Sequence, residues 1–269
     1  MIFEIIDRLH KRLRLKTVAK ELEESDMRIH EVAKDKYPAQ ERQVAANGAS
    51  SINLELGLKE IENGVSTMAN MVETAVERSL EGLRGRDMRL ARKIVEDDRK
   101  LDEKEFAIRE DCMQVITTSS PKVDHLRRIV AVLGIVTELE RMGDYAEGIA
   151  NVTLMIGEER ALALPTEVPL MASRGIEMLR DGVESFLERD VAKAKNVCKL
   201  DDEVDALYDR TFRELLVSMI QEPEGITQAT RLMWAAHNLE RFADRVTNIC
   251  EWVVFDVSGV MVDIGASKY

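Results

Sequence analysis

Aromatic residues and helix-breaking residues are scarce in this sequence. Phe, Trp and Tyr make up 4% of the 269 residues, and the chain has only 5 prolines and 14 glycines. Strands are enriched in aromatic and β-branched residues. The long stretches of this chain are instead rich in Ala, Leu, Glu, Lys, Arg and Met, which are good helix formers. The composition therefore excludes a β-rich fold and predicts an all-α protein.

Cysteine and long apolar runs are also rare. Cys112, Cys198 and Cys250 are far apart in the sequence and show no C-x-x-C spacing, as expected for reduced thiols that fill the core of a cytosolic protein. The longest apolar run, 129–136, is far shorter than the roughly 18 residues of a membrane-spanning helix, and charges interrupt the N-terminal apolar residues before they reach signal-peptide length. We therefore expect a soluble, cytoplasmic protein.

Basic residues are outnumbered, with 38 Lys and Arg against 50 Asp and Glu and a net charge of −12. Nucleic-acid backbones are bound by clustered Lys and Arg, so this balance argues against nucleic acid as the main partner. The sequence also has no G-x-x-x-x-G-K-[ST] loop, no G-x-S-x-G elbow and no nucleophile at a recognisable spacing from a base. We expect a protein that is not an enzyme and that carries no organic cofactor.

Two segments that lie 100 residues apart repeat the same pattern. Glu140-Arg-Met-Gly-Asp144 and Glu240-Arg-Phe-Ala-Asp244 each follow a leucine inside an apolar-rich segment. We therefore expect two tandem three-helix bundles related by an internal pseudo-twofold duplication, over 52–160 and 166–260, with an N-terminal amphipathic helix and linker over 1–51. Apolar residues at three- and four-residue spacing predict helices over 52–83, 88–117, 123–156, 170–187, 191–220 and 226–255.

The N-terminal segment has no counterpart in the duplication. Residues 1–20 place Ile2, Phe3, Ile6, Leu9 and Leu13 on one face of a helix, and the other face carries several Lys and Arg. We expect such a helix to pack on the bundle or to form a mobile tail. The alternative is that it lies on an anionic membrane surface or docks on a partner protein. Residues 34–51 are typical of a linker.

Acidic pairs at i,i+4 recur in register in the two halves. A single pair means little, because 50 acids in 269 positions give about nine such pairs by chance. The recurrence at offsets of 103 and 100 residues is more informative, since it places one pair on the second helix and one on the third helix of each bundle. The four pairs are Asp98/Asp102, Glu140/Asp144, Asp201/Asp205 and Glu240/Asp244.

If adjacent helices turn these pairs toward each other, four carboxylates converge in each half. Oxygen-rich sites suit iron, manganese, magnesium or calcium, and zinc is less favoured because no Cys or His pair is in position. His237 lies three residues before Glu240 and could add a nitrogen ligand, or it is simply packed or solvated. The alternative is that Arg141, Arg241 and lysines neutralise the acids in surface ion pairs. No Glu-x-x-His motif is present, which argues against di-iron oxidation chemistry.

These motifs, taken together, resemble the PhoU family of accessory regulators of high-affinity phosphate uptake. The resemblance covers about residues 53–262 and depends on the two repeated Leu-Glu-Arg motifs, on the four acidic pairs and on Pro121 before His125-Leu-Arg127. It also depends on Arg86-Asp87 and Arg189-Asp190, which open the second helix of each unit. The side chain of Asp87 can cap the first of these two helices.

The resemblance implies a non-enzymatic, homodimeric protein that damps phosphate import by contacting the ATPase of a phosphate ABC transporter and a phosphate-sensing histidine kinase. It also implies surface clusters of iron or zinc held by the acidic pairs. Arg141, Arg241 and Asn248 are candidate partner-binding residues. Peripheral membrane association, through the partners or through residues 1–20, stays open. So do two alternatives: a metal-binding protein whose clusters are its function, and an accessory protein of another phosphate transporter.

This sequence departs from the family pattern at several positions. Where the family has His after the motif Asp and Asn three residues beyond, the first unit has Tyr145 and Gly148, and the second has Arg245 but keeps Asn248. His125 replaces an expected Asp. We therefore expect a more complete metal cluster in the second unit than in the first.

Overall fold

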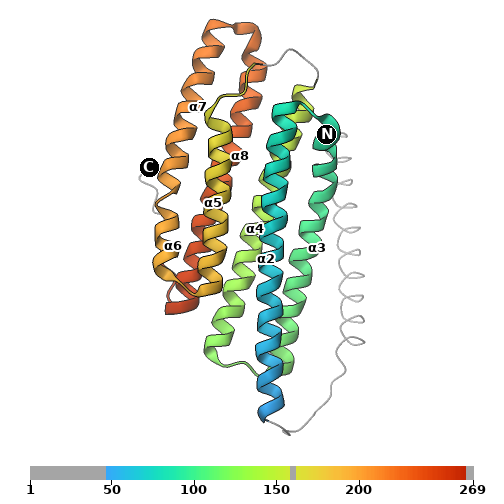
Figure 1. Ribbon diagram of the computed structural model, residues 1–269, viewed down its shortest axis with the longest axis vertical. Coiled ribbons are helices and arrows are strands. Elements are labelled where there is room, and N and C mark those ends of the chain that lie inside the picture. The colour runs from blue at the N-terminus through green and yellow to red at the C-terminus, as the bar shows by residue number, and fades with distance from the viewer. Residues whose placement is uncertain (1–46, 158–161, 265–269) are drawn as a thin grey trace, which may run out of the picture. The chain divides into compact units, whose positions relative to one another are not determined.

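The computed structural model describes residues 47–157 and 162–264, and these residues form helices joined by turns, without a strand. The all-α prediction is confirmed. The predicted N-terminal amphipathic helix lies in residues 1–46, outside the described residues. In chain order, the elements are α2 (Asn47–Gly85), α3 (Met88–Ser119), α4 (Val123–Ile156), α5 (Glu167–Glu188), α6 (Val191–Cys198), α7 (Asp201–Gln221), the 3-10 turn η1 (Pro223–Gly225) and α8 (Ile226–Ser258) (Figure 1).

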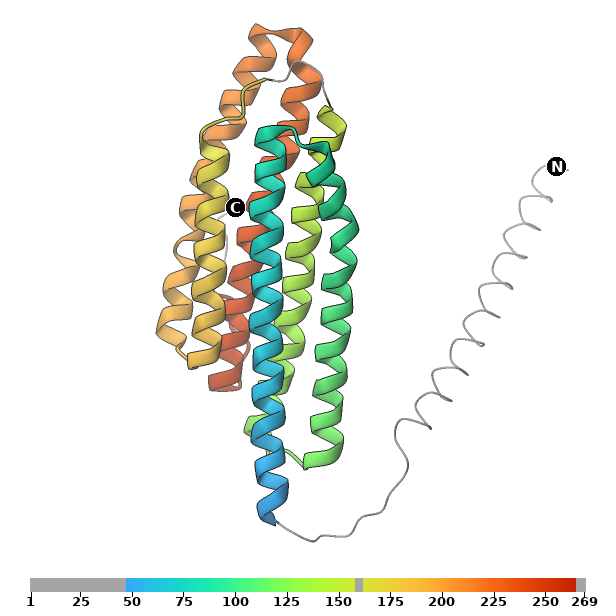
Figure 2. The same cartoon turned by 45° about the vertical axis from the view of Figure 1, so that its right-hand side comes forward.

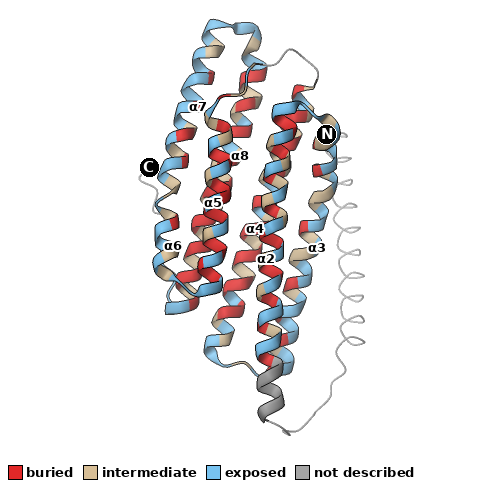
Figure 3. Cartoon of the chain, in the orientation of Figure 1, coloured by how far each residue is buried: buried red, intermediate tan, exposed pale blue. Residues whose placement is uncertain are grey.

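Two repeats make up this arrangement. The first repeat consists of α2, α3 and α4, and the second of α5, the pair α6 and α7, and α8. In Figure 2 the helices of the first repeat (blue to green) stand beside those of the second (yellow to red). The larger of two apolar clusters in the described residues runs through both repeats and includes Ile61, Ile135, Phe186 and Phe242. In Figure 3 exposed residues predominate along α7, whereas α4 carries many buried ones.

The same turn joins the first and second helices of both repeats. Arg86 and Arg189 adopt the left-handed conformation, with φ of 52° and 56°. The following Asp87 N–H donates back to the Gly82 carbonyl, and Asp190 N–H donates to Ser185 in the same way, both at 2.9 Å. This pattern closes a helix, and each aspartate then caps the next one by accepting backbone N–H bonds. The predicted capping role of Asp87 is confirmed.

Helices α4 and α8 pack along each other and form a seam between the repeats. The Asn248 side chain donates to Glu138 at 3.1 Å. In the reciprocal position, the Asn238 side chain lies against Gly148. A Cβ added to Gly148 would lie 2.8 Å from Nδ2 of Asn238. The 100-residue offset relates Glu138 to Asn238 and Gly148 to Asn248. The two contacts therefore join corresponding positions of opposite repeats, as a twofold relation requires.

The helix boundaries differ most from the sequence prediction at three places. Helix α2 begins at Asn47, inside the expected linker, and α5 begins at Glu167, because Pro169 falls in the first turn, where a missing N–H is tolerated. The prediction of a single helix over 191–220 is wrong, because two helices, α6 and α7, cover this segment. Lys199 and Leu200 N–H groups donate to carbonyls three residues back, at 3.2 and 2.9 Å, and this tighter turn separates α6 from α7.

Candidate functional site

Acidic side chains from α3 and α4 converge in the first repeat. Carboxylate oxygens of Asp98 on α3 and of Asp144 and Glu147 on α4 all lie within 4.8 Å of one another. Asp102 and Glu140 belong to the same cluster, because their charges act on these residues and on each other. We call these five residues the first acidic group. The structure thus brings Asp98 and Asp144, one member of each predicted pair, within 4.8 Å of each other, and the charges of Asp102 and Glu140 act in the same region.

Burial and mutual repulsion shift the pKa values of the first acidic group upward. Partial burial is the main cause for Asp98, and the charges of Glu147, Asp144 and Asp102 add to it, which raises its pKa to about 6. The pKa of Glu140 is raised to about 7, again by burial first and by Asp144 next. The pKa of Asp144 is also raised. The folded chain therefore holds several carboxylates that would be stabilised by a proton or by a cation.

The second acidic group consists of Asp201 and Asp205 on α7 with Glu240 and Asp244 on α8. Burial and the neighbouring Asp205 raise the pKa of Asp201 to about 7, and the pKa values of Asp205 and Glu240 are also raised by burial and then by Asp244 or Asp202. The charges of the two predicted pairs therefore act on each other between α7 and α8. The second repeat thus has a counterpart of the first acidic group, but among the described residues only the first repeat brings three carboxylates within 4.8 Å of one another.

A basic side chain already lies in the second acidic group. Arg245 Nη2 is 2.6 Å from Asp244 Oδ2, and its Nη1 is 3.3 Å from Glu138 Oε2 in the seam. In the first repeat the corresponding residue is Tyr145. The expectation of a more complete metal cluster in the second unit is therefore wrong for these residues. In the second repeat the Arg245 guanidinium takes part of the space that a cation would fill. The three close carboxylates lie in the first repeat.

His237 lies at the edge of the second acidic group. Its Nδ1 is 3.4 Å from Glu240 Oε2, and its ring centroid is 6.0 Å from that of Tyr208. The side chain is half exposed, and partial burial and the charge of Arg241 lower its pKa. The imidazole is therefore mostly neutral at pH 7 and within reach of Glu240, as the additional-ligand prediction requires.

The three candidate partner-binding residues lie on or near the seam. Arg141 donates to Glu138 at 2.9 Å, and Asn248 donates to the other oxygen of the same carboxylate. The Arg241 guanidinium lies 5.6 Å from the centre of the Tyr145 ring. Asn248 is therefore engaged within the chain, while Arg141 remains half exposed and is the most accessible of the three.

Two site residues were missed by the sequence analysis. Glu147 completes the first acidic group, and its spacing of three residues from Asp144 and seven from Glu140 places it on the same helical face. Glu138 lies one position outside the repeated motif and is 9% exposed. The seven-residue spacing could have identified Glu147, whereas nothing in the sequence distinguishes Glu138 from a surface acid.

The donor set of the first acidic group fits a hard cation. Carboxylate oxygens are its only close donors, and none of the three close carboxylates forms an ion pair with a basic side chain in the described part of the chain. Such sets suit iron, manganese, magnesium and calcium, whereas zinc sites usually contain Cys or His. Asp98, Asp144 and Glu147 would hold the ion.

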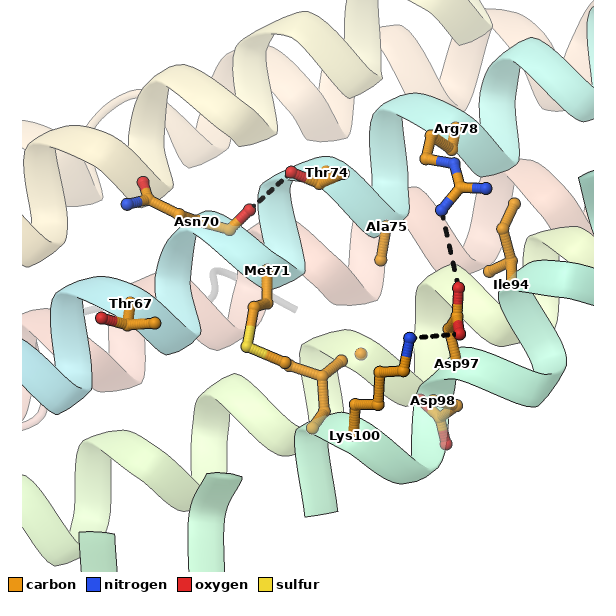
Figure 4. A pocket seen from close by; sticks show the side chains of 12 residues that line it. Thr67, Asn70, Met71, Thr74, Ala75, Arg78, Ile94, Asp97, Asp98 and Lys100 are labelled. Atoms are coloured by element: carbon orange, nitrogen blue, oxygen red, sulfur yellow. Dashed lines mark hydrogen bonds and ion pairs between the residues drawn. The ribbon is translucent and has the colours of Figure 1, made fainter. Parts of the chain in front are cut away.

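A pocket of about 350 Å³ opens beside the first acidic group, between α2 and α3. Figure 4 shows Asp97 in it, joined to Arg78 and Lys100, with Asp98 next to it. Lys100 and Lys93 approach Asp97 to 2.7 and 2.8 Å and lower its pKa to about 2. Two adjacent aspartates thus have opposite pKa shifts, and of these two only Asp98 forms no ion pair with a basic side chain in the described residues.

Comparisons with known proteins agree with this architecture. The PhoU domain matches residues 65–153 and, again, residues 168–253, one match in each repeat. No helix within 47–157 or 162–264 combines the length and the apolar character of a membrane span.

Curated relatives match most of the chain. A "Phosphate-specific transport system accessory protein PhoU homolog" of Clostridium acetobutylicum is 33% identical over 78% of this chain and 96% of its own length. A homolog of Aquifex aeolicus with the same name is 34% identical over 68% of this chain and 83% of its own. PhoU of Escherichia coli is 29% identical over 75% of this chain and 84% of its own.

Solved structures show the same fold. The phosphate transport system regulatory protein PhoU from Streptococcus pneumoniae has a TM-score of 0.73 at 28% identity, covering 78% of this chain and 99% of that one. PhoU from Pseudomonas aeruginosa has a TM-score of 0.71 at 29% identity, covering 77% and 99%. With both repeats matched and relatives above 30% identity along most of their length, the chain belongs to the PhoU family.

Proposed function

We propose that this chain is a non-enzymatic accessory regulator of phosphate uptake and of phosphate-responsive signalling. The observation that carries the proposal is the match of both repeats to the PhoU domain, together with relatives that are named as accessory proteins of a phosphate-specific transport system. The chain acts in the cytoplasm by contacting the ATPase of a phosphate transporter and a sensor histidine kinase. When phosphate is plentiful, these contacts reduce import and keep the kinase quiet.

The acidic groups support a regulator that responds to a cation. Two carboxylates with pKa values raised to about 7, and a third raised to about 6, destabilise the metal-free fold at neutral pH, so a bound ion would stabilise it. The close approach of Asp98, Asp144 and Glu147 favours the first repeat as the principal site. Its oxygen-only donors favour iron over zinc.

Deletion of the coding region tests the proposed function. We expect the deletion strain, grown in high phosphate, to take up more labelled phosphate and to express a phosphate-starvation reporter, and a plasmid copy of the wild-type chain to reverse both effects. If uptake and reporter expression both stay at the wild-type level, the proposal is wrong. Repeating the uptake assay without the high-affinity transporter identifies its target, because an effect that persists there belongs to another phosphate transporter.

The same strain tests whether complementation requires the metal ion. A chain with Asp98→Asn, Asp144→Asn and Glu147→Gln keeps the shape of these side chains but loses their charge. If the chain is primarily a metal-binding protein, this variant will lose its bound metal and fail to complement. If it complements fully, the metal is dispensable for regulation, and elemental analysis of the purified wild type then decides whether the site is occupied at all.

A further inference from the structure

A group of apolar side chains is exposed at the C-terminal end of α7 and the start of α8. Ile220 is 73% exposed, Val217 51% and Leu216 44%, and Phe212 is 40% exposed. Ile226, 46% exposed, follows at the start of α8 after η1. We call these five residues the α7 apolar face.

The aromatic contacts at the inner edge of this face fix its orientation. The Tyr208 ring lies 6.5 Å from Phe212 on the same helix and 6.0 Å from His237 on α8. Ile226 precedes His237 by 11 residues, about three helical turns, so the two side chains lie on the same side of α8. The α7 apolar face therefore extends outward from the α7–α8 contact instead of pointing into the core.

The corresponding face of the first repeat shows that the fold does not require these apolar residues. At the matching positions, Arg109, Gln114 and Thr117 replace Phe212, Val217 and Ile220. Arg109 there donates to Glu105 and to Thr137, at 2.7 and 2.8 Å. Met113 and Leu126 keep the other two positions apolar. Because the same scaffold forms with polar residues at three of the five positions, the second repeat exposes this apolar surface for another reason.

Charge around the face distinguishes between possible occupants. Residues 201–225 contain eight acids and two bases, whereas the matching residues 98–122 contain six acids and five bases. Arg213, one of the two bases, pairs with Asp209 at 3.4 Å. An anionic membrane would be repelled by this surface, and a second copy of the chain would bring an equally acidic rim against it. A basic partner would be attracted.

We propose that the α7 apolar face binds an amphipathic helix of another protein, with apolar residues at three- and four-residue spacing on one side and Lys and Arg along both flanks. Apolar residues of the partner would cover Leu216 and Ile220, and its basic flanks would meet Glu214, Glu222 and Glu224. This is the helix-in-groove mode of recognition, with the acidic rim steering the encounter. The proposal shares with the proposed function only the premise that the chain acts through protein contacts.

A designed peptide provides the test. The probe is a fluorescent 18-residue peptide of Leu and Lys with Leu at i, i+3, i+4 and i+7, and its binding to the full chain is followed by fluorescence anisotropy. Two control peptides are a scrambled sequence of the same composition and an analogue with Glu in place of every Lys. We expect the probe to bind about tenfold more tightly than either control, because only the probe has both the apolar stripe and the charge.

Matched variants locate the binding site. The double substitution Leu216→Gln and Ile220→Gln removes exposed apolar area and should weaken probe binding about tenfold. The matched pair in the first repeat, Met113→Gln and Thr117→Gln, should change it less than about twofold. Circular dichroism and thermal unfolding confirm that both variants fold.

Several outcomes would overturn the proposal. Equal binding of the probe and the scrambled peptide would do so, as would unchanged affinity in the Leu216/Ile220 variant. A dimer that sedimentation detects in the wild type but not in this variant would identify a second copy as the occupant. None of these results alters the phosphate-uptake phenotype of the deletion strain, so the two proposals fail independently.

Discussion

Arg128 on α4 donates from Nη1 to Oδ2 of Asp256 on α8 at 2.7 Å, and their side chains are 5% and 0% exposed. The same guanidinium donates to the Phe186 carbonyl at 2.7 Å, lies 3.6 Å from the centre of the Phe186 ring and pairs with Glu62 on α2. One buried arginine therefore links helices of both repeats. The contacts span up to 128 residues of sequence.

Removal of this arginine should be strongly destabilising. Arg128→Leu leaves the Asp256 carboxylate buried without its main partner, and we expect the free energy of unfolding to fall by about 3–5 kcal/mol. Chemical denaturation measures the loss. The double variant Arg128→Leu with Asp256→Leu should recover most of it, because no charge then remains buried and unpaired. The exposed pair of Arg213 and Asp209 is the control, and Arg213→Leu should cost less than about 1 kcal/mol.

Stability of the metal-free protein should fall as the pH rises from about 4 to about 8. The pKa values of Glu140 and Asp201 are raised to about 7 in the fold, so the folded chain binds these protons more tightly than the unfolded chain does. The protonated groups favour the fold at low pH, and that contribution is lost as the pH passes through the raised pKa values. Because both groups are partly solvated, we expect about 1 kcal/mol from each.

Thermal unfolding in the presence of a chelator measures this slope. Glu140→Gln and Asp201→Asn should each flatten the decline between about pH 5 and pH 8, because neither variant side chain titrates. Asp97→Asn is the control, because the pKa of Asp97 is shifted in the opposite direction. The pKa of Asp97 is lowered by its lysine partners, so its contribution is lost toward acid pH and its removal should leave the decline above pH 5 in place.

Addition of a hard cation should reverse the destabilisation at pH 7.5. With Mn²⁺ or Fe²⁺ in excess, we expect the unfolding temperature of the wild type to rise by several degrees, since an ion that binds only the folded state stabilises it by mass action. Asp98→Asn with Asp144→Asn should abolish the rise. The matched pair Asp201→Asn with Asp244→Asn should reduce it less, because Arg245 already neutralises part of that group. Equal effects of the two pairs would contradict the assignment of the first repeat as the principal site.

Two glycines in the seam should respond differently to alanine. A Cβ on Gly134 would overlap the rigid Trp252 ring, whereas a Cβ on Gly148 would meet only the end of the Asn238 side chain. Alanine in a helix gains about 1 kcal/mol over glycine. We therefore expect Gly148→Ala to be nearly neutral and Gly134→Ala to cost about 1–3 kcal/mol by overpacking, measured by chemical denaturation.

Local patterns in the sequence predicted much of this structure. The bounds of α4 and the capping by Asp87 follow from apolar spacing and from the chemistry of one side chain. The convergence of Asp98 with Asp144, and of Asp201 with Asp244, follows from the repeat itself, because matched helices pack in matched ways.

Other features depend on contacts between distant residues and could not be predicted. Arg245 enters the second acidic group because its long side chain reaches across the seam to Glu138, which no local pattern indicates. The pairing of Arg128 with Asp256 likewise joins residues that have no sequence relation to each other. The break between α6 and α7 contains neither proline nor glycine, so the sequence carries no signal for it.

The seam between α4 and α8 has a consequence for how the chain could be divided. The reciprocal contacts of Glu138 with Asn248 and of Gly148 with Asn238 do not depend on the peptide connection between Ile156 and Glu167. The two repeats are in this respect like the subunits of a dimer whose genes have been fused. We expect the two repeats, produced as separate polypeptides, to associate through this seam. Either repeat alone would expose the apolar surface of its seam helix and would be prone to aggregate.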